Sequence, residues 1–269
     1  MQMNVNQFTS VFGLVCLLFL NPMATHAQIV LCDNLGLDKI SNSQSFLTKN
    51  ELVHCAFKIQ NEAFLLDEME CKFDSARILT EKALEIWRYI DDTLNQANLL
   101  KYLGYLNGHL GKLDLAKSQI HEAIKFYKLK NAEYGVAVSL FNLSRVYEYQ
   151  HNIDSALYYA NRSKEFWTIQ KDAGRLLSLN NHLLHLYSLS GSSENYEILI
   201  EQNNRFVEAP DIYWQNELDF YFVTSELYEK HNLIREQEKF VKLYEMKIEE
   251  LQHTVGTKPY SLYDERNCR

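Results

Sequence analysis

The sequence has few residues that break helices. It contains only 3 prolines and 9 glycines among 269 residues, where average usage would give about 13 and about 19. This shortage excludes a collagen-like chain and a low-complexity linker protein, and it argues against an all-β chain with a turn about every ten residues. With 46% hydrophobic and 13% aromatic residues, the composition is that of a folded, mostly helical protein.

Cysteine is also sparse. Cys16 lies in an apolar N-terminal segment, and the other four are Cys32, Cys55, Cys71 and Cys268. Four cysteines are too few for a disulfide scaffold, and the absence of a CxxC pair argues against a zinc knuckle or a thioredoxin-like site. Cys55 and Cys71 are separated by most of one predicted helix, about 20 Å at 1.5 Å per residue, which is too far for a bridge.

Positive charge is in deficit. The chain has 27 Lys and Arg against 35 Asp and Glu, a net charge of −8 at pH 7. Nucleic acid is therefore not expected as a direct partner, because phosphate binding needs a basic face; a local basic patch remains compatible with these counts.

Motifs of catalysis and cofactor binding are missing as well. The chain has no glycine-rich phosphate loop, no HExxH, no GxSxG and no EF-hand loop, so we expect no enzyme activity and no cofactor. His182 and His185 stand three residues apart on a predicted helix and can both reach one metal ion, but the sequence offers no evident third ligand. No metal site is predicted.

Residues 1–27 carry no Asp, Glu, Lys or Arg, and their apolar run at 11–20 precedes Asn21-Pro22 and small residues that end at Ala27. This order is typical of a secretory signal peptide, and ten apolar residues are too few to span a bilayer as a helix. We expect export to the periplasm or cell envelope, with cleavage after Ala27. Since no Lys or Arg precedes the run, the alternative is an uncleaved segment that anchors the chain to the membrane.

A period of 40 residues runs through the rest of the chain. It is visible in Phe73-Asp74-Ser75-Ala76, Leu113-Asp114-Leu115-Ala116 and Ile153-Asp154-Ser155-Ala156. Aromatic residues keep the same phase at Trp87, Tyr127 and Trp167, and so do the candidate helix N-caps Asn50, Asp91, Asn131, Asp172 and Asp211. Apolar residues within each unit recur at helical spacing, so each unit is predicted to be a pair of helices, with the three aromatic residues packed between units.

The units resemble tetratricopeptide repeats of the longer, about 40-residue kind. The first-helix pattern of that family is matched by Leu103-Gly104, Tyr147, Tyr187 and Tyr228, and the small residues of its second helix by Ala76/Ala83, Ala116/Ala123 and Ala156/Ser163. The resemblance covers about residues 51–251 and implies an all-α, right-handed solenoid of about five antiparallel helix pairs. Unit four departs from the pattern at Tyr196, where Ala is expected, and unit five lacks the Asp-x-Ala signature.

This division of the chain gives four segments. We expect a signal peptide at 1–27, a linker or cap at 28–50, the repeat domain at 51–251 and an exposed tail at 252–269.

The resemblance also implies a binding face. In tetratricopeptide proteins the concave face is lined by the first helices and usually binds a peptide or an extended segment of another protein. The matching positions are Asn61, Lys101, Tyr105, Phe141, Asn142, Arg145, Asn181, His185, Phe222 and Glu226. Amides can pair there with a peptide backbone, aromatic rings can hold side chains, and Arg145 with Lys101 can hold a carboxylate. The family's clamp for C-terminal carboxylates needs further basic residues where Ser178 and His182 stand, so that activity is not predicted.

Three functions remain open. The leading expectation is a non-enzymatic, exported scaffold that binds another protein or a peptide and touches the membrane only through an uncleaved N-terminal segment. The first alternative is a sensor or input module of a signalling or transcription-regulating system. The second is an intracellular peptide-responsive regulator, which requires residues 1–27 to stay uncleaved.

Overall fold

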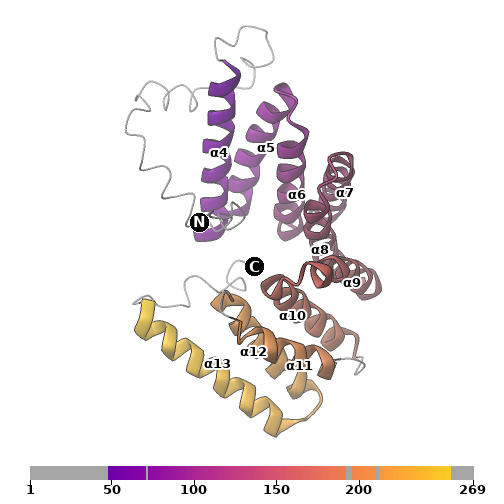
Figure 1. Ribbon diagram of the computed structural model, residues 1–269, viewed down its shortest axis with the longest axis vertical. Helices are drawn as coiled ribbons and strands as arrows, with labels where there is room; N and C mark the ends of the chain where they lie inside the picture. The colour runs from indigo at the N-terminus through magenta and orange to yellow at the C-terminus, as the bar shows by residue number, and fades with distance from the viewer. Residues whose placement is uncertain (1–47, 71, 192–195, 210–211, 256–269) are drawn as a thin grey trace, which may run out of the picture. The chain divides into compact units, whose positions relative to one another are not determined.

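The structure is a computed structural model that describes residues 48–70, 72–191, 196–209 and 212–255. In these ranges the chain forms helices and turns, without a strand. The ten helices described there are α4 (Lys49–Glu70), α5 (Phe73–Tyr89), α6 (Thr93–His109), α7 (Leu113–Leu129), α8 (Glu133–Tyr149), α9 (Ile153–Gln170), α10 (Ala173–Ser190), α11 (Tyr196–Phe206), α12 (Trp214–Lys230) and α13 (Ile234–Val255). The predicted all-α fold of successive helix pairs is confirmed (Figure 1).

The chain divides into two compact units, residues 1–55 and 56–269. In the first unit the described residues are 48–55, the start of α4. Thr48 and Glu51 form a capping box there, in which the Thr48 N–H donates to Glu51 Oε2 (2.7 Å) and the Glu51 N–H donates to Thr48 Oγ1 (3.3 Å). Asn50, the N-cap expected from the sequence, lies inside the helix instead. Cys55 takes part in a disulfide bond.

In the second unit, consecutive helices pack against one another as hairpins. The pairs are α6 with α7, α8 with α9, α10 with α11 and α12 with α13, and the first helices also contact each other, α6 with α8 and α10 with α12. In Figure 1 the same succession can be followed from α5 to α13. The first helices of successive pairs therefore lie side by side, which brings residues about 40 positions apart into contact.

The turns between the helices repeat one backbone conformation every 20 residues. Positive φ angles of 53° to 71° occur at Asp91, Gly111, Asn131, His151, Lys171 and Gly191. The N–H that follows each of these residues, up to Lys171, donates to a carbonyl five positions back, as from Lys112 to Asn107 (2.8 Å). This is the Schellman pattern, which satisfies the last carbonyls of each helix.

The same turns correct two of the expected caps. Asp91 and Asn131 occupy the left-handed turn position, and the N-caps that follow them are Asp92 and Ala132. The expectation was wrong by one residue because Asp and Asn are favoured at both kinds of position. Asp172 is an N-cap as predicted, and its Oδ1 accepts the Arg175 N–H (2.9 Å). Asp211 lies outside the described residues.

Small residues let the two helices of a pair approach closely. Ala76, Ala83, Ala116, Ala123, Ala156 and Ser163 are all fully buried. On the opposite helix, a Cβ built on Gly104 would lie 2.3 Å from Ile120 Cγ1. Trp87, Tyr127 and Trp167 are buried at 1–3% exposure, so their predicted place in the core is confirmed.

The last two units are less regular than the middle ones. α11 has 11 residues where the other second helices have 17 to 22, and Tyr196 at its start is buried. α13 continues to Val255, past residue 252, where the expected tail begins. No helix among the described residues is long and apolar enough to cross a membrane. The signal peptide expected at 1–27 lies outside the described residues.

Candidate functional site

The candidate site is the set of half-exposed side chains on α6, α8 and α10, which we call the first-helix face. Its residues come from helices 40 positions apart and meet because these helices lie side by side. The Arg145 guanidinium lies 5.7 Å from the centre of the Tyr105 ring, and the Tyr149 hydroxyl lies 3.5 Å from His109 Nε2. The phase argument from the sequence thus brings Tyr105 and Arg145 together.

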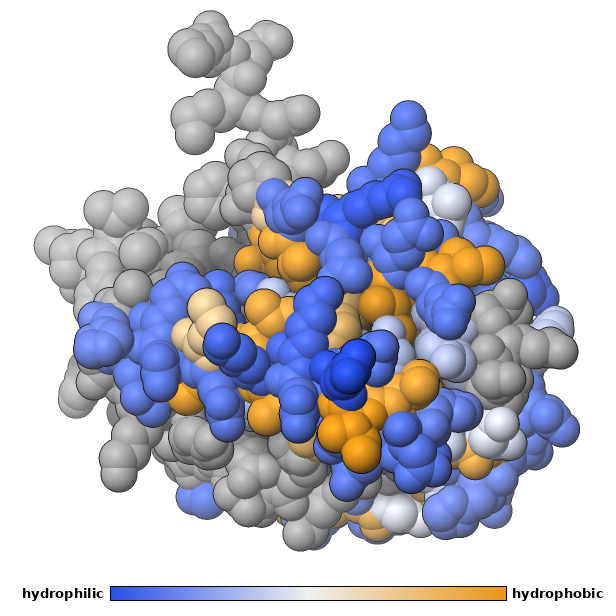
Figure 2. Space-filling view, turned by 90° about the horizontal axis from the view of Figure 1, so that it is seen from below, coloured by the Kyte–Doolittle hydropathy of each residue, from blue (hydrophilic) through white to orange (hydrophobic). Residues whose placement is uncertain are grey.

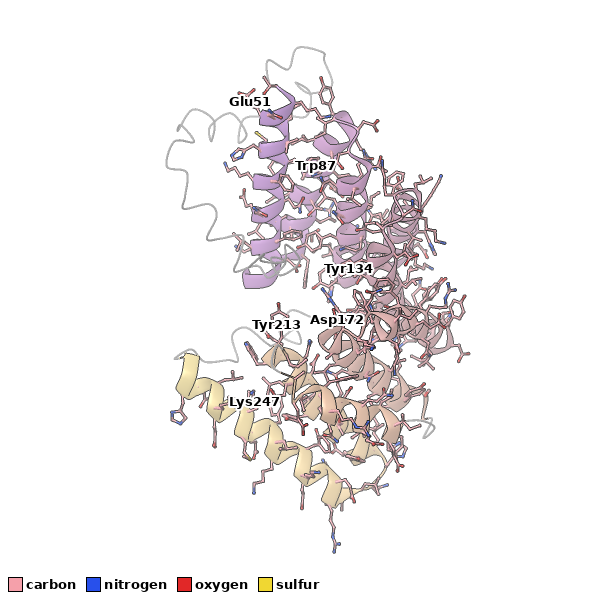
Figure 3. All side chains as sticks on the ribbon, viewed as in Figure 1. Glu51, Trp87, Tyr134, Asp172, Tyr213 and Lys247 are labelled. Carbon is pink, nitrogen blue, oxygen red and sulfur yellow. The ribbon has the colours of Figure 1, made fainter. Side chains whose placement is uncertain are left out.

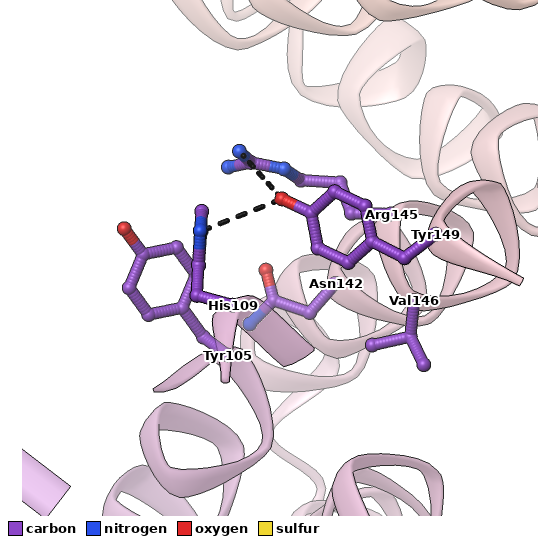
Figure 4. A pocket seen from close by; sticks show the side chains of 6 residues that line it. All are labelled: Tyr105, His109, Asn142, Arg145, Val146 and Tyr149. Atoms are coloured by element: carbon purple, nitrogen blue, oxygen red, sulfur yellow. Dashed lines mark hydrogen bonds between the residues drawn. The ribbon is translucent and has the colours of Figure 1, made fainter. Parts of the chain in front are cut away.

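One part of this face is a small aromatic pocket (Figure 4) lined by Tyr105, His109, Asn142, Arg145, Val146 and Tyr149. Arg145 Nη2 donates to the Tyr149 hydroxyl (3.4 Å), and His109 stacks on Phe73 with the ring centres 4.8 Å apart. These contacts fix both the guanidinium and the rings. Aromatic rings beside a guanidinium offer a surface on which a planar or apolar group of a partner can pack.

A second part is a nearly buried acid between two histidines. Glu148 Oε1 lies 3.2 Å from His185 Nε2, and Glu148 Oε2 lies 3.6 Å from His182 Nδ1. Burial opposes the ionisation of Glu148, but the hydrogen bond from His185 and the positive charges near it outweigh burial and lower the Glu148 pKa. The carboxylate is therefore charged at neutral pH and is held by His185.

His182 is held in one tautomer by Ser144. The Ser144 hydroxyl donates to the Ala156 carbonyl (2.7 Å), and its oxygen lies 2.7 Å from His182 Nε2. Because the single hydroxyl proton is already used, Nε2 must carry the proton and donate to Ser144. Burial lowers the pKa of His182 to about 3, so the ring is neutral at pH 7.

The line of Ser144, His182 and Glu148 has the order of a nucleophile, a base and an acid. Ser144 is fully buried, however, so a substrate cannot reach its hydroxyl, and the contacts serve to join α8 to α10. Among the described residues no group of three His, Cys, Asp or Glu side chains is arranged to hold a metal ion.

A third part of the face carries two positive charges. Lys101 on α6 is half-buried, and loss of water together with the charge of Arg175 on α10 lowers its pKa to about 8. Arg175 donates to the Tyr134 hydroxyl (2.9 Å) and lies over the rings of Tyr134 (5.9 Å) and Trp167 (5.7 Å). Figure 3 labels Tyr134 at the start of α8 and Asp172 at the start of α10.

The other expected residues differ in how far they reach solvent. Asn181 is only 3% exposed, and both ends of its amide are used within the fold: Nδ2 donates to the Asn216 carbonyl (2.9 Å), and Oδ1 accepts from Asn203 (2.9 Å). Its side chain thus joins three helices and does not face a partner. Phe141 packs its ring against His182, with 5.2 Å between the ring centres. Three further residues of the expected face are half-buried: Asn61, Phe222 and Glu226.

Sequence reasoning missed several members of the face. His109 and Tyr149 stand 40 residues apart, so the period itself would have paired them. Arg175 and Tyr134 sit in the first turns of α10 and α8, one or two turns before the positions that the family resemblance marks.

The comparisons with known proteins bear on the fold. No protein-family model matches the chain, and no curated protein matches it. Among solved structures, it is similar to the crystal structure of BtubC (BKLC) from P. vanneervenii, with a TM-score of 0.64 and 16% sequence identity over 82% of this chain and 89% of that chain. At this identity the likeness concerns the fold alone, an all-helical, solenoid-like arrangement.

Proposed function

We propose that this protein is a non-enzymatic scaffold of the tetratricopeptide-like kind, which binds an extended segment of another protein on its first-helix face. The observation that carries the proposal is the line of held but half-exposed polar and aromatic groups on three neighbouring helices. Tyr105, Asn142 and Arg145 lie in one pocket, and His185 continues the line on α10. A row of this length suits an extended chain better than a compact small molecule.

On the side of the molecule that Figure 2 shows, hydrophobic residues lie among hydrophilic ones. The face on α6, α8 and α10 offers rings beside charges, and a partner that satisfies both would be favoured over a purely apolar one.

We further propose that the protein is exported. The charge-free segment 1–27 supports this, and so does the disulfide bond of Cys55, because disulfides persist in oxidising compartments and are rare in the cytosol. N-terminal sequencing of the native protein tests the proposal. A mature start at Gln28 is expected, whereas an intact Met1 together with a free Cys55 thiol would contradict export.

Binding is tested by crosslinking the purified protein to partners from a cell-envelope fraction and identifying them by mass spectrometry. Tyr105→Ala and Arg145→Glu should abolish capture while the helical circular dichroism of each variant shows that the fold remains.

The chain offers a matched control on a second helix. Arg162 on α9 donates to the Tyr158 hydroxyl (2.9 Å) and lies 5.8 Å from that ring. Arg145 makes contacts of the same two kinds, a hydrogen bond to Tyr149 and a ring contact with Tyr105. Tyr158→Ala and Arg162→Glu should leave capture unchanged. If the Tyr105 and Arg145 variants lose capture no more than the Tyr158 and Arg162 variants do, the binding site does not lie on the first-helix face.

A further inference from the structure

A continuous line of aromatic rings runs along the first-helix face. We call it the ring line, and its members are Tyr102, Tyr105, His109 and Tyr149. The first three lie on α6 at spacings of three and four residues, and their ring centres follow one another at 6.0 and 4.5 Å. The Tyr149 ring on α8 continues the line, 5.6 Å from the His109 ring. All four residues are half-buried, so each keeps part of its surface exposed to solvent.

Other residues hold these rings in place. The Tyr102 hydroxyl donates to Asp67 Oδ2 (2.8 Å), and the Phe64 ring packs edge-to-face against the Tyr102 ring, with 4.5 Å between the centres. The Phe73 ring stacks on the His109 ring at 4.8 Å. The ring line is therefore built into the packing of α4, α5, α6 and α8.

The charges beside the ring line favour an uncharged guest. The Arg145 guanidinium already lies over the Tyr105 ring, 5.7 Å from its centre, where a cationic side chain of a partner would otherwise bind, and like charges repel. Glu148 lies one turn along α8 from Arg145, and its negative charge offsets part of the attraction of Arg145 for an acidic side chain. A neutral ring is therefore favoured over a charged side chain of either sign.

One polar group beside the rings is not used within the fold. The Asn142 side chain lines the pocket with Tyr105, His109 and Tyr149 (Figure 4), and its amide makes no hydrogen bond with any other described residue. Such an amide can donate to a carbonyl of a peptide backbone. A polyproline II segment has no internal hydrogen bonds, so its carbonyls are available to this donor.

The length of the line on α6 also suits a polyproline II segment. From Tyr102 to His109 the helix rises about 10 Å, at 1.5 Å per residue. A polyproline II helix rises about 9 Å in one turn of three residues, so two prolines three residues apart present their rings on one side at nearly the same spacing. Grooves lined by aromatic rings are a recurring surface for such segments.

We infer that the ring line binds a proline-containing stretch of the partner segment, in the polyproline II conformation, with two prolines three residues apart. The two proline rings pack on the ring line, and a carbonyl between them accepts a hydrogen bond from Asn142 Nδ2. The inference rests on the proposed function and names the chemistry of the segment that binds there.

The test uses two libraries of 12-residue peptides, acetylated and amidated at their ends, with the same random uncharged residues around two fixed positions three residues apart. One library has Pro at both positions and the other has Ala. Affinity selection on the full chain, followed by mass spectrometry, should enrich Pro peptides at least about tenfold over Ala peptides. Tyr105→Leu and His109→Leu remove a ring but keep apolar bulk, so they should bring that ratio close to one, while Tyr105→Phe should keep most of it.

Tyr158→Leu is the matched control. The Tyr158 ring also contacts a neighbouring ring, that of Tyr159 (5.1 Å), and an arginine, Arg162, but it lies on a second helix, so its loss should leave the ratio unchanged.

Equal enrichment of the two libraries, or a ratio that survives both the Tyr105→Leu and His109→Leu substitutions, would overturn the assignment to proline. So would a third library, with Phe at both positions, that is enriched over the Pro library. Peptide binding that Tyr105→Ala abolishes would still support the scaffold in these cases, whereas binding of none of the libraries would overturn the proposed peptide binding itself.

Discussion

Replacing Gly104 with alanine tests the close approach of α6 and α7. Ala favours a helix over Gly by about 1 kcal/mol, so on an isolated helix the change would stabilise. Here the new Cβ would meet Ile120 Cγ1 at 2.3 Å, Ile120 Cδ1 at 2.9 Å and the Ala116 carbonyl oxygen at 3.1 Å. Ile120 is fully buried, and the oxygen belongs to the backbone, so the contact can be relieved only by moving one helix from the other.

Overpacking of this kind costs typically about 1–3 kcal/mol. With contacts this short we take the upper end and subtract the helix preference, which leaves a net loss of about 2 kcal/mol. For a chain of this size that corresponds to a melting temperature lower by about 4–8 °C. Urea unfolding followed by circular dichroism at 222 nm measures the difference directly.

Gly174 provides the contrast within the same fold. A Cβ there would meet only Asp172 Oδ1, at 3.7 Å, so Gly174→Ala should be neutral or stabilise by up to about 1 kcal/mol. A double-variant cycle sharpens the test, because Ile120→Ala removes the atoms that Gly104→Ala would strike. In that background Gly104→Ala should cost nothing or stabilise. A Gly104→Ala protein as stable as wild type would refute the reasoning.

Three further predictions concern single positions. Lys171→Gly should raise the free energy of unfolding by up to about 1 kcal/mol, because a side chain at positive φ is strained; no gain in the urea midpoint would contradict this. Asp172→Ala should lower it by about 1 kcal/mol through loss of the α10 cap, and an unchanged midpoint would count against the cap. The pKa of His182 is lowered to about 3, below an unfolded value of about 6.5. As the pH falls through 6.5, His182 takes up a proton in the unfolded chain but stays neutral in the folded protein. The free energy of unfolding should therefore fall, by roughly 1–2 kcal/mol at pH 5. His182→Gln, which keeps a donor for Ser144, should flatten that part of the urea-midpoint profile, and an identical profile would contradict the assignment.

Much of the fold could be predicted from the sequence because the same pattern of residues recurs in several units. Three copies of an Asp-x-Ala segment fixed the phase, and the small residues beside it showed where two helices approach. The one-residue error at Asp91 and Asn131 has a local cause, since both residue types suit either a left-handed turn or an N-cap. The 20-residue period of the left-handed turns could not be predicted from the sequence, because successive turn positions hold different residue types: Asp, Gly, Asn, His and Lys.

The candidate site was less predictable, because a period fixes which residues are neighbours but not how deeply each is buried. Asn181 occupies the same row as Lys101, yet its side chain is used up by the Asn203 amide on α11 and the Asn216 backbone carbonyl on α12. Lys101, in contrast, is only partly buried.

The different burial of Asn181 and Lys101 depends on which residues the neighbouring units place around each of them. Asn203 lies on α11 and Asn216 on α12, where the repeat is least regular, and they supply a donor and an acceptor for Asn181. In a solenoid each unit completes its neighbours, so binding groups remain available where a unit fails to satisfy the one before it.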